Sequence, residues 1–223
     1  MVSIGGLNGQ LICRTVLVTP SGKFFPQGSR LARRMAIDIA GFVTDLKDHA
    51  IEHGFHVHDE RHYMETYSLR QSWEVDVHPE DACGGPLDLH LSLDVEPRTL
   101  LSMQDRIDEM GDDWEEPEDL YRLNLFFNWS ILPKLSTPPD LLVLGTDLAG
   151  VGGVDLPIEV TAIDTIANIT DAPERSLQVV GKCQVSLVDV FMAREQLCEE
   201  LDRAKAVSEY LLERVTGWLE LPG

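Results

Sequence analysis

Residues 87–95 read LDLHLSLDV, and this segment decides the fold. Apolar and polar side chains alternate along it, which puts one face of a β-strand on a hydrophobic core and the other in water. Residues 73–78, WEVDVH, alternate in the same way, and the turn-rich stretch PEDACGGP at 79–86 lies between the two segments. The sequence therefore predicts an antiparallel hairpin with one apolar and one polar face.

Two longer helices are predicted outside this hairpin. Residues 30–53 carry apolar side chains at helical spacing, with Ser29 as N-cap and Gly54 as a stop signal. Residues 190–219 carry a second apolar stripe after Asp189. Such a stripe packs against a sheet or against its twin in a homodimer. We expect the sheet, and a homodimer through 190–219 is the alternative.

Shorter patterns complete the expected fold. Residues 98–110 are predicted to form a helix, and the Gly-rich residues 150–153 a loop. Further strands are expected at 11–18, 121–132, 140–144, 158–163 and 176–188. Residues 1–223 are therefore expected to form a single α+β domain: an antiparallel, curved sheet of about six to eight strands, packed by an N-terminal helix and a long C-terminal helix.

The charge is strongly negative and unevenly distributed. The formal net charge is -20, and residues 55–120 carry nineteen Asp/Glu against four Lys/Arg. Such a field repels nucleic acids and anionic membranes and favours basic partners or cations. Four cysteines without a regular spacing suit a reducing compartment, so we expect a cytoplasmic protein.

Much of this charge falls in an acidic loop expected around residues 105–120. An aromatic side chain amid carboxylates is a typical anchor for a protein partner. The sequence of this loop therefore predicts a surface that binds a basic protein. That surface would consist of Asp112, Asp113, Trp114, Glu115, Glu116, Glu118 and Asp119.

All seven histidines fall between His49 and His90, and they suggest a divalent metal as cofactor. His56 and His58 would share one face of a strand, with His62 following. With the hairpin turn near residue 83, Asp76 would face His90, His78 would face Asp88, and Glu74 would face Ser92. The candidate metal ligands are His56, His58, His62, Asp76, His78, Asp88 and His90.

Two function classes follow from these patterns. Residues 1–223 contain no recognisable nucleophile motif, cofactor loop or complete metal motif. We therefore expect a non-catalytic, acidic protein-binding or adaptor domain that engages a basic protein and neither nucleic acid nor a membrane. The alternative is a metal-dependent enzyme, a hydrolase, that uses the His/Asp-rich region 56–94.

Overall fold

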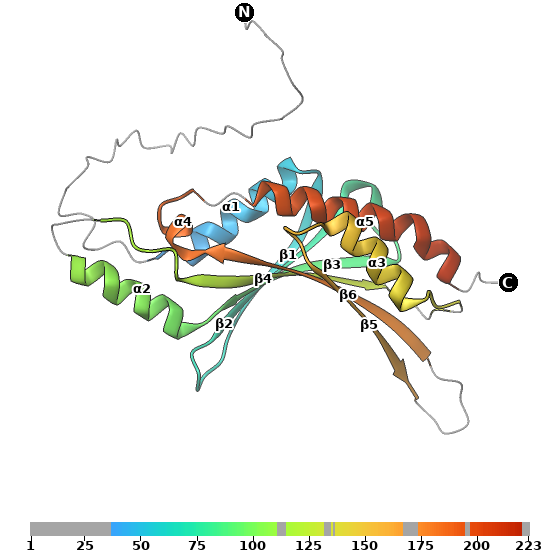
Figure 1. Cartoon of the computed structure of the whole chain (residues 1–223), viewed down its shortest axis with the longest axis horizontal. Coiled ribbons are helices and arrows are strands. Elements are labelled where there is room, and N and C mark those ends of the chain that lie inside the picture. The colour runs from blue at the N-terminus through green and yellow to red at the C-terminus, as the bar shows by residue number, and fades with distance from the viewer. Residues whose placement is uncertain are drawn as a thin grey trace, which may run out of the picture.

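The computed structural model describes residues 37–110, 115–131, 135, 137–166, 174–194 and 197–219. Within these residues six antiparallel strands form one open, curved sheet in the order β1-β2-β3-β4-β6-β5 (Figure 1). The strands are β1 (Phe55–Met64), β2 (Gln71–Pro79), β3 (Leu87–Val95), β4 (Arg122–Ile131), β5 (Ile158–Thr165) and β6 (Glu174–Ser186). The predicted α+β class and the curved antiparallel sheet are confirmed.

The helices gather on one face of this sheet. They are α1 (Ile39–Glu52), α2 (Pro97–Met110), α3 (Leu141–Gly152), α4 (Leu187–Phe191) and α5 (Cys198–Trp218), with a 3-10 turn η2 (Glu80–Ala82). Figure 1 shows α1, α3, α4 and α5 over the same face, whereas α2 lies beyond one end of the sheet. The sheet is therefore covered on one side by the chain's first and last described helices.

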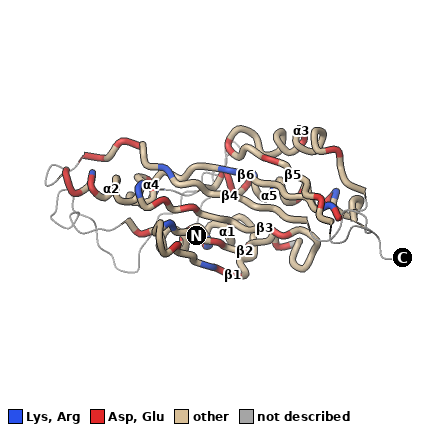
Figure 2. Tube along the Cα trace, turned by 90° about the horizontal axis from the view of Figure 1, so that it is seen from below, with Lys and Arg blue, Asp and Glu red and all other residues tan. Residues whose placement is uncertain are grey.

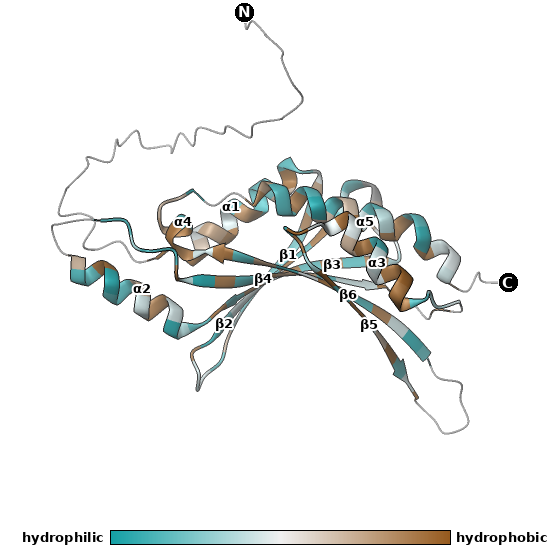
Figure 3. Ribbon diagram, in the orientation of Figure 1, coloured by the Kyte–Doolittle hydropathy of each residue, from teal (hydrophilic) through white to brown (hydrophobic). Residues whose placement is uncertain are grey.

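The alternation of side chains fixes which face of the sheet is covered. In β3 every odd-numbered residue from Leu87 to Val95 is buried and every residue between them is half-buried. Figure 3 colours the strands by hydropathy, with hydrophilic and hydrophobic residues interspersed along them. β4 continues the pattern with Phe127 and Trp129 fully buried. The Nε1–H group of Trp129 donates to Ser208 Oγ of α5 at 2.8 Å, which satisfies a polar group inside the core.

The long C-terminal helix is interrupted. α4 ends at Phe191 and α5 begins at Cys198, and the chain between them includes Ala193 and Leu197 at φ 52° and 51°. The expected strand over 176–188 ends at Ser186, because the side chain of Ser186 accepts from Asp189 N–H and caps α4. The predicted long C-terminal helix is confirmed as α5, which begins at Cys198 and not at residue 190, and residues 187–191 form the separate short helix α4.

The strand expected at 140–144 is wrong. Residues 141–152 form α3, because Asp140 caps the backbone N–H groups of Leu142 and Val143. The glycines at 150–153, expected to be a loop, complete this helix, and Gly153 ends it at φ 70°.

Some of the predicted elements lie partly or wholly outside the described residues. The expected strand at 11–18 and residues 30–36 of the first expected helix lie outside them. The described part of that helix begins at Ile39 and not at residue 30, because the side chain of Asp38 accepts from Gly41 N–H and caps it. Helix α2 continues to Met110 and so contains residues 105–110 of the expected acidic loop. Among the helices that the structure describes, none is long and apolar enough to cross a membrane.

Candidate functional site

The uncovered face of the sheet, here called the open face, carries the polar half of the strand alternation. Figure 2 views the molecule from this side. On β2 and β3 the open-face residues are half-buried, among them Glu74, Asp76, His78, Asp88, His90 and Asp94. No helix in the described part of the chain lies across them (Figure 1).

The pairing of β2 with β3 has the predicted register. Asp76 pairs with His90 and Glu74 with Ser92. His90 Nδ1 lies 3.3 Å from Asp76 Oδ1, and His78 Nε2 lies 3.4 Å from Asp88 Oδ1. The expected cross-strand neighbours are confirmed.

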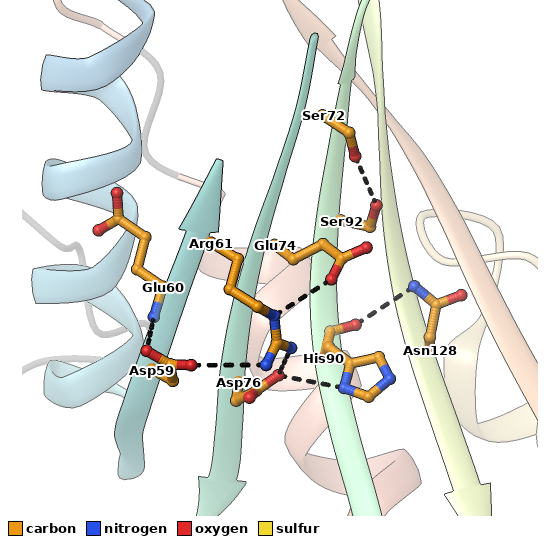
Figure 4. Close-up of polar contacts among 9 residues, drawn as sticks. All are labelled: Asp59, Glu60, Arg61, Ser72, Glu74, Asp76, His90, Ser92 and Asn128. Atoms are coloured by element: carbon orange, nitrogen blue, oxygen red, sulfur yellow. Dashed lines mark hydrogen bonds and ion pairs between the residues drawn. The ribbon is translucent and has the colours of Figure 1, made fainter. Parts of the chain in front are cut away.

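Arg61 of β1 occupies the centre of the acidic part of the open face (Figure 4). Its Nη2 lies 2.6 Å from Asp76 Oδ1, and its other nitrogens lie 3.4 Å from Glu74 Oε2 and from Asp59 Oδ2. The hydrogen bond to Asp76 is the main reason why the pKa of Arg61 is raised. Three carboxylates therefore share one guanidinium, and the cluster keeps a negative charge.

A shallow pocket adjoins this cluster. Its volume is about 520 Å³, and its lining includes Tyr63, Met64, Arg70, Glu74, Asp94 and Phe126. Arg70 forms a charge-assisted pair with Asp94 and lies 3.4 Å from Glu96 Oε1. The hydrogen bond to Asp94 is the main reason why the pKa of Arg70 is raised. The lining of the pocket thus contains the aromatic rings of Tyr63 and Phe126 as well as carboxylates that already pair with arginines.

A β-bulge at His58 changes which face the second half of β1 presents. The register shifts between Val57 and Asp59, so that His56 pairs with His78 and His62 with Trp73. His62 therefore lies on the helix side, stacked on Trp73 with ring centroids 3.9 Å apart and hydrogen-bonded to Gln71 at 3.0 Å. The structure thus separates His62 from His56 and His58, with which the sequence had grouped it.

The remaining predicted metal ligands fall into two groups. His56 and His58 lie beside His78, whose ring centroid is 4.8 Å from that of His58. Asp76 and His90 belong to the Arg61 cluster instead. The two histidine clusters read from the sequence therefore meet at His58 and His78.

Sequence reasoning missed Cys83 as a member of this site. The thiol Sγ lies 3.1 Å from His56 Nδ1 and 3.5 Å from His58 Nε2. The three side chains are exposed, and their donor atoms all lie within 4.8 Å of one another. The sequence does place Cys83 in the turn between the two alternating segments. Because His56 pairs with His78 just before that turn, the turn brings Cys83 next to His56.

A second group with metal-ligand chemistry joins two helices. His49 lies in the last turn of α1, His53 is the C-cap residue of the same helix, and Cys198 begins α5. Carboxylates already engage both rings: His53 Nδ1 lies 2.6 Å from Asp202 Oδ1, and His49 Nδ1 lies 3.2 Å from Glu52 Oε2. The interpretation of the sequence did not include this group, because Cys198 is remote from the histidines along the chain.

The acidic segment is partly engaged within the protein. Glu116 forms a bidentate pair with Arg194, and the hydrogen bond from Arg194 is the main reason why the pKa of Glu116 is lowered. Asp119 accepts from Ser186 Oγ at 2.7 Å and pairs with Arg122. Glu115 and Glu118 are exposed, whereas Asp112, Asp113 and Trp114 lie outside the described residues.

No family model, no curated protein and no solved structure matches this chain. The functional proposal therefore depends on the geometry of the open face and of the clusters beside it.

Proposed function

We propose that the protein is a non-catalytic, acidic binding domain that holds a basic protein segment on the open face of its sheet. The observation that carries the proposal is the arrangement of charges across β1, β2 and β3. Two guanidinium groups, of Arg61 and Arg70, stand against the carboxylates of Asp59, Glu74, Asp76, Asp88 and Asp94. The surface thus has a net negative charge that suits Lys and Arg side chains.

The internal ion pairs support this choice of partner. Arg61 binds Asp59, Glu74 and Asp76, and Arg70 binds Asp94, so the spacing of these oxygens suits a planar guanidinium. Phe126 lines the adjoining pocket and faces Lys182 of β6, whose Nζ lies 5.6 Å from the ring centroid. The ring thus already contacts one ammonium group, and a basic side chain of the partner would replace Lys182 there.

The rest of the molecule agrees with a basic partner. A net charge of -20 accelerates association with a cationic protein and disfavours nucleic acid and anionic membranes. Glu115 and Glu118 are exposed and add to the negative charge of the described surface. We place the protein in the cytoplasm as part of the same proposal, because its cysteine spacing suits a reducing compartment.

The experiment compares two carboxylates on the open face with two on the opposite side of the molecule. Short peptides of equal length, one rich in Lys and Arg and one rich in Glu, are titrated against the full chain at low and high salt. The test variant is Glu74→Gln with Asp94→Asn. The matched control is Glu209→Gln with Glu213→Gln, which neutralises exposed carboxylates of α5.

We expect binding of the basic peptide only, with an affinity that falls as salt rises. The test variant should weaken it about fivefold or more, since charged interface pairs contribute about 1 kcal/mol or more. The control should weaken it less than twofold after correction for net charge. Equal loss in the two variants would show that only the overall charge matters, and the open face would be rejected as the binding site.

The second candidate is a metal-dependent hydrolase that uses region 56–94. Two histidines and a cysteine with a solvent position is the ligand set of some catalytic zinc sites, and His56, His58 and Cys83 match it in type. We rank this function second because all three side chains are exposed, whereas catalytic sites exclude water around the reacting atoms. Zinc-dependent hydrolysis of activated esters that disappears in Cys83→Ser would reverse the ranking.

A further inference from the structure

We propose that His56, His58 and Cys83 bind one zinc ion, which clamps the start of edge strand β1 to the turn between β2 and β3. The inference does not depend on the binding function proposed above, because Arg61 pairs with Asp59, Glu74 and Asp76 and the zinc ligands are other residues.

The distances between the donor atoms fit a tetrahedral ion. Zinc bonds of about 2.3 Å to sulfur and 2.0 Å to nitrogen, at a tetrahedral angle, put the two donors about 3.5 Å apart. The thiol of Cys83 lies 3.5 Å from His58 Nε2 and 3.1 Å from His56 Nδ1. Small side-chain rotations therefore suffice to admit the ion.

The donor types select the metal. One thiolate and two imidazoles form a borderline-soft set, which favours zinc over magnesium and calcium, ions that prefer oxygen ligands. The exposure of the three side chains gives the ion access from solvent. Solvent supplies the fourth ligand in this arrangement.

Backbone features hold the three ligands at this place. The bulge at His58 lies one residue beyond the pairing of Val57 with Val77. The turn that carries Cys83 is fixed by Glu80 N–H donating to Gly54 O at 3.1 Å and Gly85 N–H donating to Ala82 O at 2.9 Å. Gly84 follows at φ 76°, a conformation that favours glycine. The ligands thus come from two segments whose relative position is already set.

His78 contacts one of the three proposed ligands. Its ring meets that of His58 edge-on, with an interplanar angle of 76°, and its Nε2 lies 3.4 Å from Asp88 Oδ1. A zinc ion bound here would tie together residues that are 27 positions apart in sequence.

The test uses full-length, tag-free protein that has been stripped with a chelator and titrated with Zn²⁺ and with Co²⁺. The cobalt form should show a near-ultraviolet thiolate-to-metal charge-transfer band. Cys83→Ser should abolish the band and weaken zinc binding roughly 100-fold, because it removes the thiolate ligand. Cys198→Ser, which alters the His49/His53/Cys198 group, and His62→Ala are the matched controls and should keep both properties.

A zinc ion that holds β1 to the turn should also stabilise the fold, whereas adventitious binding should not. Zinc at about 100 times its Kd should raise Tm by about 5–10 °C in the parent protein and leave Cys83→Ser unchanged. Amide exchange should slow in 55–58 and 79–86 and not in β5. The proposal is overturned if Cys83→Ser keeps the cobalt band, if Cys198→Ser loses it instead, or if zinc leaves exchange in these segments unaltered.

Discussion

The two faces of this sheet are formed by the same strands, but the side chains on one face are buried under helices and those on the other face are not. Phe127 and Phe126 are neighbours on β4, yet Phe127 is fully buried beneath the helices and stacks near Trp129, whereas Phe126 lines the pocket of the open face. The covered face therefore forms the hydrophobic core, and the open face carries polar and ionisable side chains. A strand that alternates in this way specifies both at once, because successive side chains point in opposite directions.

The largest expected effect compares these two phenylalanines. Phe127→Ala should lower the free energy of unfolding by about 3–5 kcal/mol, because it opens a cavity in a closed core. Phe126→Ala should lower it by about 1 kcal/mol and should also weaken binding of the basic peptide. Urea unfolding measures the first effect and peptide titration the second. Equal losses of stability would contradict the difference between the faces.

The next effect tests the polar contact inside the covered face. Ser208→Ala leaves Trp129 Nε1–H without its acceptor and should cost about 1–3 kcal/mol. Trp129→Phe in the Ser208→Ala background removes the donor as well. In the Trp129→Phe background the donor is absent, so Ser208→Ala should lower the free energy of unfolding much less there. A double-mutant cycle of urea unfolding measures the difference. Additive losses would show that the hydrogen bond contributes nothing.

A smaller effect is expected from the ion pairs of the open face. Arg61→Gln leaves Asp59, Glu74 and Asp76 to repel one another, and it should lower Tm by less than Ser208→Ala does. Salt should reduce the difference, because the cluster is partly exposed. At the same time the variant should bind the basic peptide more tightly, because its guanidinium no longer competes. Weaker binding would contradict the proposed role of these carboxylates.

The smallest effect concerns a carboxylate on the covered side. Burial, followed by the nearby charges of Glu199 and Asp155, raises the pKa of Glu200 on α5. The folded state therefore binds this proton more tightly than the unfolded chain does, so stability from this group is present at low pH and is lost as pH rises through the raised pKa. Glu200→Gln should stabilise the protein at pH 7 by less than about 1 kcal/mol, since the group is partly exposed.

The pH dependence provides the check on that variant. The gain should shrink as pH falls and vanish below about pH 4.3, where the parent carboxyl is protonated in both states. Thermal unfolding at several pH values measures it. A gain that stays the same at every pH would contradict the raised pKa of Glu200.

Much of the sheet could be predicted from the sequence because period-2 alternation fixes both the faces and the register. The pairing of Asp76 with His90 follows from the length of the turn at 79–86. Residues 141–152 could not be assigned in this way, since an apolar run with no clear period is compatible with a strand or a helix. The side chain of Asp140, which caps the first turn, decides for the helix.

The candidate sites were only partly predictable, for a different reason. A bulge has no residue signature that distinguishes His58 from any other strand position, so the divergence of His62 from His56 required the structure. Cys83 and the contact between His58 and His78 depend on β1 pairing with the far end of β2. The register of that pairing cannot be derived from the sequence of either strand alone.

The bulge in β1 also bears on how the protein avoids aggregation. β1 and β5 form the two edges of the sheet, and an open edge can template addition of a strand from another molecule. The bulge breaks the regular spacing of hydrogen-bonding groups on β1, and the adjacent residues Asp59, Glu60 and Arg61 place charge along that edge. β5 has no register shift along its pairing with β6 and carries Val160 and Ala162 between Glu159 and Asp164. Of the two edges, β5 is therefore the one at which we expect intermolecular strand pairing to start in concentrated solution.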